Sequence, residues 1–102
     1  MSQLFVRTGI HFSSSRQALE HIGEEMLARG VVHDSYPLAL LEREATFPTG
    51  IALEQHAVAI PHCEAVHAKS PAIYLIRPDN PVPFQRADDD GEIDVSLIIA
   101  LM

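Results

Sequence analysis

A histidine follows directly after a short apolar run in the segment Ala-Val-Ala-Ile-Pro-His-Cys at residues 57–63. The apolar run predicts a short buried strand. Pro61 has no backbone N–H and a fixed φ, so we expect regular strand pairing to end there. His62 would then stand on a loop at the end of a rigid strand, a common place for reactive groups in α/β proteins.

The imidazole of His62 could act as a nucleophile, because its neutral form has a ring nitrogen with a free lone pair at neutral pH. The group that it could accept is a phosphoryl group. The alternative is a histidine whose ring is simply hydrogen-bonded within its loop. Position alone leaves both interpretations open.

Arg43 is the second candidate, near the end of a predicted helix in Leu-Glu-Arg-Glu-Ala at residues 41–45. A guanidinium beside the histidine could bind phosphoryl oxygens in a fork and stabilise the charge that spreads during transfer. The alternative is a surface arginine paired with Glu42 or Glu44.

Other ligand and nucleophile patterns are weaker. His56, His62, Cys63 and His67 match no strong zinc spacing, and contiguous residues on an extended chain point to opposite sides. A Cys63 nucleophile would normally meet its histidine through the fold and not at the adjacent position. The acidic run at 88–90 lacks the ligand pattern of a calcium loop, and no glycine-rich phosphate loop is present. We therefore expect no metal, cofactor or nucleotide.

The composition is that of one small domain with an acidic surface. The chain has 102 residues, of which 47% are apolar, enough for a real but small core. Its 14 acidic and 7 basic residues give a formal net charge of −7, which argues against nucleic-acid binding and suits a basic protein partner. The single cysteine fits a reducing compartment. No apolar run of about 18 residues and no signal peptide are present, so we expect a soluble, cytoplasmic protein.

Two helices are expected in the first half of the chain, after a first strand at 3–12. Ser14 and Gln17 fit a capping box at the start of the first helix, and Gly30 suits its end. Asp34 could cap the second helix, with Pro37 in its first turn. The apolar stripe of this helix is predicted to be Leu38, Leu41 and Ala45, and residues 47–50 should end it.

Strands dominate the second half, at 57–61, at 72–77 and in the final apolar run. We expect Pro83 and Phe84 at an edge or bend, and a solvated acidic loop before the last strand. Residues 95–102 resemble a central strand with no turn after it, so we expect the domain at 1–102 to continue beyond Met102. The predicted fold is a single small α/β domain with a mixed sheet flanked by helices, one sheet face being left for helices that are missing.

Four ordered segments resemble the enzyme IIA domain of the bacterial sugar phosphotransferase system, of the fructose/mannitol type. They are Arg-Glu-Ala-Thr-Phe-Pro-Thr-Gly at 43–50, Ala-Ile-Pro-His at 59–62, Pro-Val-Pro-Phe at 81–84 and the apolar strand that follows. No single segment is specific, but the set spreads over nearly the whole chain. The segment at 81–84 looks most like galactitol-specific members, and an insertion at 51–56 makes the loop between the arginine and the histidine longer than in mannitol-like members.

The resemblance implies a mannitol-type enzyme IIA-like fold and a phosphocarrier function. Enzyme IIA takes a phosphoryl group from the phosphohistidine of HPr and passes it to the cysteine of enzyme IIB during sugar or polyol uptake, without a metal. By this match His62 is the phosphorylated residue and Arg43 is the family's active-site arginine. The family usually carries a second active-site histidine soon after the last strand, beyond Met102.

A regulatory domain of the same fold is the alternative. In the nitrogen-related relatives, the resemblance implies that the phosphorylation state of the histidine controls protein binding. Enzyme IIA contacts proteins and not the sugar, so galactitol is implied by the resemblance alone. The oligomeric state is open, and an uncovered final strand could pair with a second copy.

Overall fold

The computed structural model describes residues 2–102. The elements follow the chain in the order β1 (Gln3–Ile10), α1 (Ser15–Ala28), α2 (Tyr36–Thr46), β2 (Gly50–Ala52), β3 (Ala57–Ala59), the 3₁₀-helix η1 (Ala65–His67), β4 (Ala72–Pro78), β5 (Val82–Gln85), β6 (Glu92–Val95) and β7 (Leu97–Leu101). A five-stranded sheet has the order β1-β4-β7-β3-β2, and β5 and β6 form a separate two-stranded sheet. The β1–β4 and β3–β7 pairs are parallel, whereas β4–β7 and β2–β3 are antiparallel. The predicted small α/β domain with a mixed sheet is confirmed.

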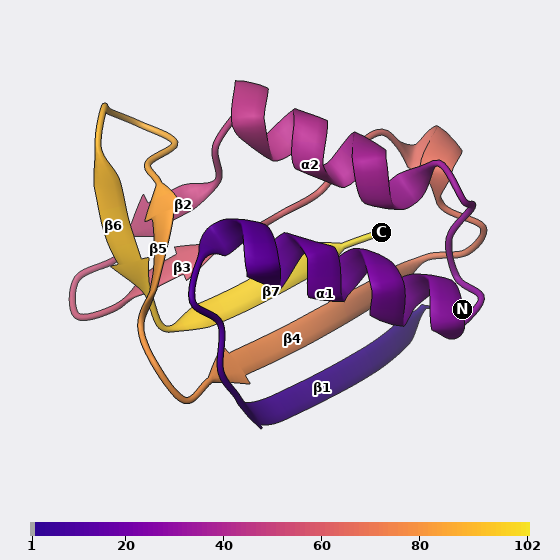
Figure 1. Ribbon diagram of the computed structural model, residues 1–102, viewed down its shortest axis with the longest axis horizontal. Coiled ribbons are helices and arrows are strands. Elements are labelled where there is room, and N and C mark those ends of the chain that lie inside the picture. The colour runs from indigo at the N-terminus through magenta and orange to yellow at the C-terminus, as the bar shows by residue number, and fades with distance from the viewer. Residues whose placement is uncertain (1) are drawn as a thin grey trace.

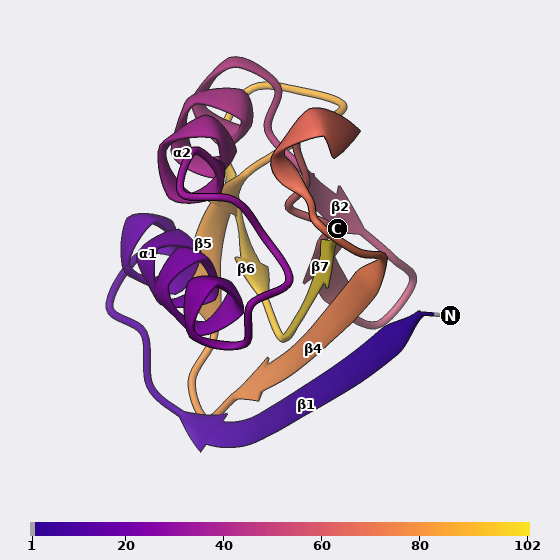
Figure 2. The same ribbon diagram turned by 90° about the vertical axis from the view of Figure 1, so that its right-hand side faces the viewer.

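Both helices lie on one face of the five-stranded sheet (Figures 1 and 2). Side chains of β4 and β7, such as Tyr74 and Ile98, are buried against helix residues such as Ile22 and Leu40. The opposite face carries exposed apolar side chains, namely Leu4, Val6, Ile73 and Leu101. The prediction that one sheet face is left without helices therefore holds for residues 2–102.

The start and end of α1 follow the predicted local signals. The Ser14 hydroxyl accepts a hydrogen bond from the Gln17 N–H (3.1 Å). The Gln17 side chain reaches back to the N–H of Ser13 (2.6 Å), one residue before the cap. Gly30 has φ +73°, which allows it to end the helix where a residue with a Cβ would be strained. No helix in residues 2–102 is long and apolar enough to cross a membrane.

The predicted cap and buried face of α2 are wrong. Ser35, and not Asp34, is the residue at the N-cap, although Pro37 does lie in the first turn as expected. The buried side chains of the helix are Tyr36, Leu40 and Glu44, while Leu38 and Ala45 are exposed and Leu41 is half-buried. The pattern was misleading because a glutamate on the buried face is normally assigned to the solvent side.

Several strands of the second half also differ from the prediction. The insertion at 51–56 begins within β2 and turns into β3, so it forms the β2–β3 hairpin. Residues 82–85 form β5, one of the two edges of the two-stranded sheet, so Pro83 and Phe84 lie at an edge as predicted. Ser96 divides the final apolar run between β6 and β7. β7 lies between β4 and β3 inside the sheet, as the central-strand pattern of residues 95–102 predicted, so it is not an uncovered edge that could pair with a second copy. The acidic residues at 88–90 are exposed in the loop between β5 and β6, as expected.

Gly50 allows the two sheets to approach each other closely. Its backbone oxygen accepts a hydrogen bond from the N–H of Ala87 (2.8 Å). A Cβ at this position would lie 2.6 Å from the carbonyl oxygen of Gln85, well inside contact distance. Only glycine fits here without a backbone shift, and the beginning of β2 is thereby held against the end of β5.

Candidate functional site

His62 lies in the loop after β3, at the end of the sheet where β7 also ends. β3 stops at Ala59, two residues earlier than predicted. Pro61 is fully buried, and its carbonyl accepts a hydrogen bond from the N–H of Leu101 (3.1 Å). The backbone that carries His62 is thus held against a central strand of the sheet, which fixes where the imidazole can be placed.

The imidazole of His62 has one nitrogen engaged and one available. Its Nδ1 lies 2.8 Å from the carbonyl oxygen of Ile60. A carbonyl oxygen only accepts, so Nδ1 must carry the proton. In the neutral ring the lone pair is then on Nε2, and the half-buried ring presents a nucleophilic nitrogen away from its own backbone.

A chain of hydrogen bonds leads from Ile60 back to α2. The Ile60 N–H donates to the Thr49 hydroxyl oxygen (3.1 Å), and that hydroxyl donates to Glu44 Oε1 (2.8 Å). The Thr49 N–H donates to the other carboxylate oxygen of Glu44 (2.8 Å). Both side chains are almost fully buried, with 8% of Glu44 and 7% of Thr49 exposed.

The pKa of Glu44 responds to opposing influences. Burial raises it, whereas the two hydrogen bonds from Thr49 and the charge of a protonated His62 lower it. Glu44 thus lies within electrostatic range of the candidate nucleophile. Its position four residues after Leu40, on the buried face of α2, is the one sequence signal that could have drawn attention to it.

Arg43 follows the expectation that it would stand near the end of the second helix. Its guanidinium lies over the ring of Phe47, with 4.6 Å between the guanidinium carbon and the ring centroid. Its Nε is buried and has no hydrogen-bond partner among residues 2–102. The alternative of an ion pair with Glu42 or Glu44 is not what the structure shows, since no such pair occurs among its described residues. An unpaired buried donor is costly and favours an acceptor from outside the chain.

A pocket of about 280 Å³ lies between α2 and η1, and its lining includes residues that directly follow His62 in the sequence. Arg43, Phe47 and Glu42 line it from the helix side, and Cys63, Glu64 and His67 line it from the loop after β3. The Nδ1 of His67 lies 2.8 Å from the Ser35 hydroxyl, which ties η1 to the beginning of α2. The pocket therefore brings Arg43 together with Cys63, the residue that follows His62, whereas His62 itself is not among its lining residues.

The metal and thiol alternatives find little support. No group of three His, Cys, Asp or Glu side chains within residues 2–102 is placed to hold a metal ion. His56 is exposed in the β2–β3 loop, whereas His67 belongs to η1. Burial is the main cause that raises the pKa of Cys63, with Glu64 adding to it and Arg43 opposing it. The thiol is consequently protonated at neutral pH and a poor nucleophile.

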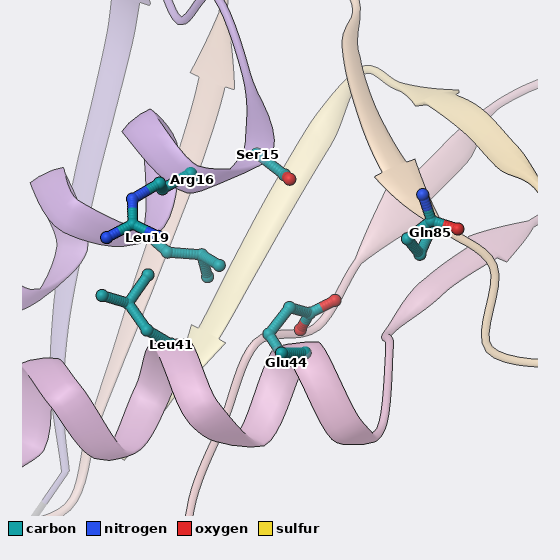
Figure 3. Close-up of a pocket in the computed structure, with 7 residues that line it drawn as sticks. Ser15, Arg16, Leu19, Leu41, Glu44 and Gln85 are labelled. Atoms are coloured by element: carbon teal, nitrogen blue, oxygen red, sulfur yellow. The ribbon is translucent and has the colours of Figure 1, made fainter.

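A second pocket, of about 180 Å³, lies on the other side of the hydrogen-bond chain (Figure 3). Figure 3 shows Glu44 rising from α2 toward the space between Ser15 at the beginning of α1 and Gln85 at the end of β5. Leu19 and Leu41 cover its apolar side. Glu44 therefore lines this pocket and also accepts the two hydrogen bonds from Thr49.

The whole chain matches a known family. The family model for "Phosphoenolpyruvate-dependent sugar phosphotransferase system, EIIA 2" covers residues 1–102. The "PTS system galactitol-specific EIIA component" of Escherichia coli strain K12 is 67% identical over 102 residues, which is 100% of this chain and 68% of that relative. The same protein of Escherichia coli O157:H7 shows the same identity and coverage.

Solved structures share the fold at lower identity. A complex of enzyme IIAMTL and phosphorylated enzyme IIBMTL from Escherichia coli matches with a TM-score of 0.80 and 20% identity, covering 99% of this chain and 70% of that chain. Nitrogen regulatory protein IIA-Ntr from Neisseria meningitidis matches with a TM-score of 0.70 and 25% identity, covering 96% of this chain and 66% of that chain. With the family match over its full length, the chain belongs to the EIIA 2 family of the phosphoenolpyruvate-dependent sugar phosphotransferase system.

Proposed function

We propose that this chain is a phosphocarrier in which His62 accepts a phosphoryl group from phospho-HPr and donates it to the cysteine of an enzyme IIB. The observation that carries the proposal is the hydrogen bond from Nδ1 to the Ile60 carbonyl, which leaves the Nε2 lone pair free. Family membership supports it, as does Arg43, which shares a pocket with Cys63 and whose Nε has no partner among the described residues.

The transfer under this proposal needs no proton to leave His62. The Nε2 lone pair forms a bond to phosphorus as the P–N bond of the donor phosphohistidine breaks, and the donor ring leaves with that electron pair. In the second step a thiolate sulfur of enzyme IIB forms the P–S bond, and the P–N bond to His62 breaks. The ring gains positive character while it holds the phosphoryl group, and the Ile60 carbonyl and the Glu44 carboxylate stabilise that charge.

Arg43 would bind the phosphoryl oxygens during both steps. The transferring group spreads negative charge over its equatorial oxygens, and catalysis is largely positioning and electrostatic stabilisation. A guanidinium suits this role because it presents several donors in a planar fork. The stacking on Phe47 holds its plane without occupying its donors.

The substrate of the transport system is proposed from the relatives. The identity of 67% to galactitol-specific EIIA components favours galactitol as the polyol taken up. The chain itself would handle the phosphoryl group and contact HPr and enzyme IIB, in the cytoplasm and without a cofactor. The acidic surface, with its formal net charge of −7, suits partners with basic surfaces.

Intact mass spectrometry after incubation with phosphoenolpyruvate, enzyme I and HPr tests the proposal. One acid-labile phosphoryl increment is expected in the wild type and in His56→Ala, which changes an exposed histidine of the β2–β3 loop. The increment should be absent in His62→Ala. A His62→Ala variant that is still phosphorylated to the wild-type level would refute the assignment of the nucleophile.

A regulatory function is the second candidate, since the nitrogen regulatory protein shares the fold at 25% identity. Adding the galactitol enzyme IIB to the phosphorylated chain distinguishes the transport function from the regulatory function. Loss of the phosphoryl increment on a millisecond-to-second scale supports the transport phosphocarrier. A phosphoryl group that stays on the chain favours the regulatory function.

A further inference from the structure

We propose that Glu44 and Thr49 are positioning residues for His62, a role that rests on the proposed phosphocarrier function. They hold the Ile60 backbone in the orientation in which its carbonyl accepts the Nδ1 proton. Nε2 alone is then free to receive the phosphoryl group. Both residues act through the backbone of Ile60 and not on the reacting atoms.

The carboxylate of Glu44 sets the direction of each hydrogen bond that joins Glu44, Thr49 and Ile60. An ionised carboxylate only accepts hydrogen bonds, so both the N–H and the hydroxyl of Thr49 must donate to Glu44. The hydroxyl proton is thereby directed at Glu44, and a lone pair of the same oxygen faces the N–H of Ile60. Because Glu44 and Thr49 are more than nine-tenths buried, water competes little for these bonds.

The backbone of this segment needs such support because the regular sheet has already ended. The last paired residues of the β2–β3 ladder are Gly50 and Ala59. The next residue, Ile60, takes the Thr49 hydroxyl in place of a strand partner, and Pro61 has no N–H to offer. On the far side, Leu101 holds the carbonyl of Pro61. The carbonyl that receives the Nδ1 proton is therefore fixed from both ends.

The choice of ring tautomer is the functional consequence. The opposite tautomer of His62 would place a proton on Nε2, where the phosphoryl group has to bind. It would also turn the Nδ1 lone pair against the carbonyl oxygen of Ile60, leaving two acceptors face to face. A backbone free to rotate would lose this selection, and the reactive population of the ring would fall.

Two substitutions remove the support in different ways. Thr49→Val keeps the shape of the side chain but removes the hydroxyl, whereas Thr49→Ser keeps the hydroxyl. Glu44→Gln keeps the size of the side chain but offers one oxygen where two are used. In one orientation the amide NH2 faces the Thr49 N–H and that hydrogen bond is lost. In the other orientation it faces the Thr49 hydroxyl, which must then accept instead of donate, so its proton is no longer directed at residue 44. Matched controls are Thr8→Val on β1 and Glu24→Gln on α1, both exposed.

The test combines ring spectroscopy with transfer kinetics in the full chain. Long-range ¹H–¹⁵N spectra of histidine-labelled protein, recorded where the ring is neutral, report the tautomer of His62. The initial rate of phosphorylation by phospho-HPr reports the reactive population. Wild type, Thr49→Ser and both controls should show an unprotonated Nε2 and similar rates. Thr49→Val and Glu44→Gln should populate the opposite tautomer and react more slowly, by about tenfold for Thr49→Val.

Three results would overturn the proposal. One is a folded Thr49→Val variant with the wild-type tautomer and rate. Another is a Thr49→Ser variant as impaired as Thr49→Val, which would point to packing and not to the hydroxyl. If Thr49→Val does not fold, a Glu44→Gln variant with wild-type spectra and rate decides against the proposal. Absence of phosphorylation in the wild type would refute the phosphocarrier function itself, while the ring spectra would still decide whether Glu44 and Thr49 set the tautomer.

Discussion

Replacing Arg43 should separate its part in transfer from its part in stability. In the resting protein the guanidinium makes one identified favourable contact, the stacking on Phe47, which contributes about 0.5–1 kcal/mol. Its Nε is buried and finds no partner within residues 2–102, a state that costs about 1–3 kcal/mol. These effects oppose each other, so Arg43→Gln should change the free energy of unfolding by about 1 kcal/mol or less.

The effect on transfer should be much larger. A donor that stabilises charge developing in the transition state contributes about 2.7–4 kcal/mol, so Arg43→Gln should slow phosphorylation of His62 by about 10²–10³-fold. Arg43→Lys keeps the charge but loses the planar fork of donors, so its transfer rate should lie between those of the wild type and Arg43→Gln. Arg77→Gln, an exposed arginine on β4, is the matched control and should behave as the wild type.

Rapid-quench measurement of transfer from phospho-HPr gives the transfer rate of each variant. Urea unfolding of the same variants gives the free energy of unfolding. Transfer by Arg43→Gln at nearly the wild-type rate would refute a role for Arg43 in binding the phosphoryl group. A loss of unfolding free energy as large as the loss of transition-state stabilisation would refute it equally, because Arg43 would then be a structural residue.

Three further predictions concern the surroundings of the site. Gly50→Ala should destabilise the chain by about 1–3 kcal/mol in urea unfolding, because its Cβ would meet the Gln85 carbonyl at 2.6 Å; unchanged stability would contradict the close approach. Cys63 should react with iodoacetamide at pH 7 more slowly than a free thiol, because burial raises its pKa, and a fast reaction would contradict that burial. Burial also raises the pKa of Glu44 above its ordinary value of 4.5, so the folded chain takes up this proton first as the pH falls. As the pH falls from the raised pKa toward 4.5, the free energy of unfolding of the wild type should therefore increase relative to that of Glu44→Gln. A decrease over this range in paired urea titrations would refute this sign.

Features that depend on neighbouring residues could be predicted from the sequence. The hydroxyl of Ser14 and the backbone freedom of Gly30 act within one helical turn, so the bounds of α1 follow from them. The apolar run before Pro61 forms a strand and the proline ends it, although β3 is two residues shorter than expected. The residue types of His62 and Arg43 made them candidates for phosphoryl chemistry without the fold, and their roles stay a proposal.

Features that depend on distant partners could not be predicted. β2 has only three residues and exists because it pairs with β3, and its approach to Gln85 requires the glycine at position 50. The division of the last apolar run at Ser96 depends on β6 pairing with β5 while β7 enters the other sheet. Short strands of this kind carry too little local preference to be identified from periodicity alone.

The sequence by itself determined which side chains are candidates for the chemistry, because an imidazole has a nitrogen lone pair that can accept a phosphoryl group and a guanidinium has several donors that can bind one. Only the tertiary structure decided which nitrogen of His62 is available and what holds it. That decision needs Glu44 from a helix, Thr49 from the loop after it and Ile60 from the end of a strand to meet in a buried place. A glutamate is assigned to solvent by sequence pattern, and only burial beside Thr49 turns it into a partner of the site.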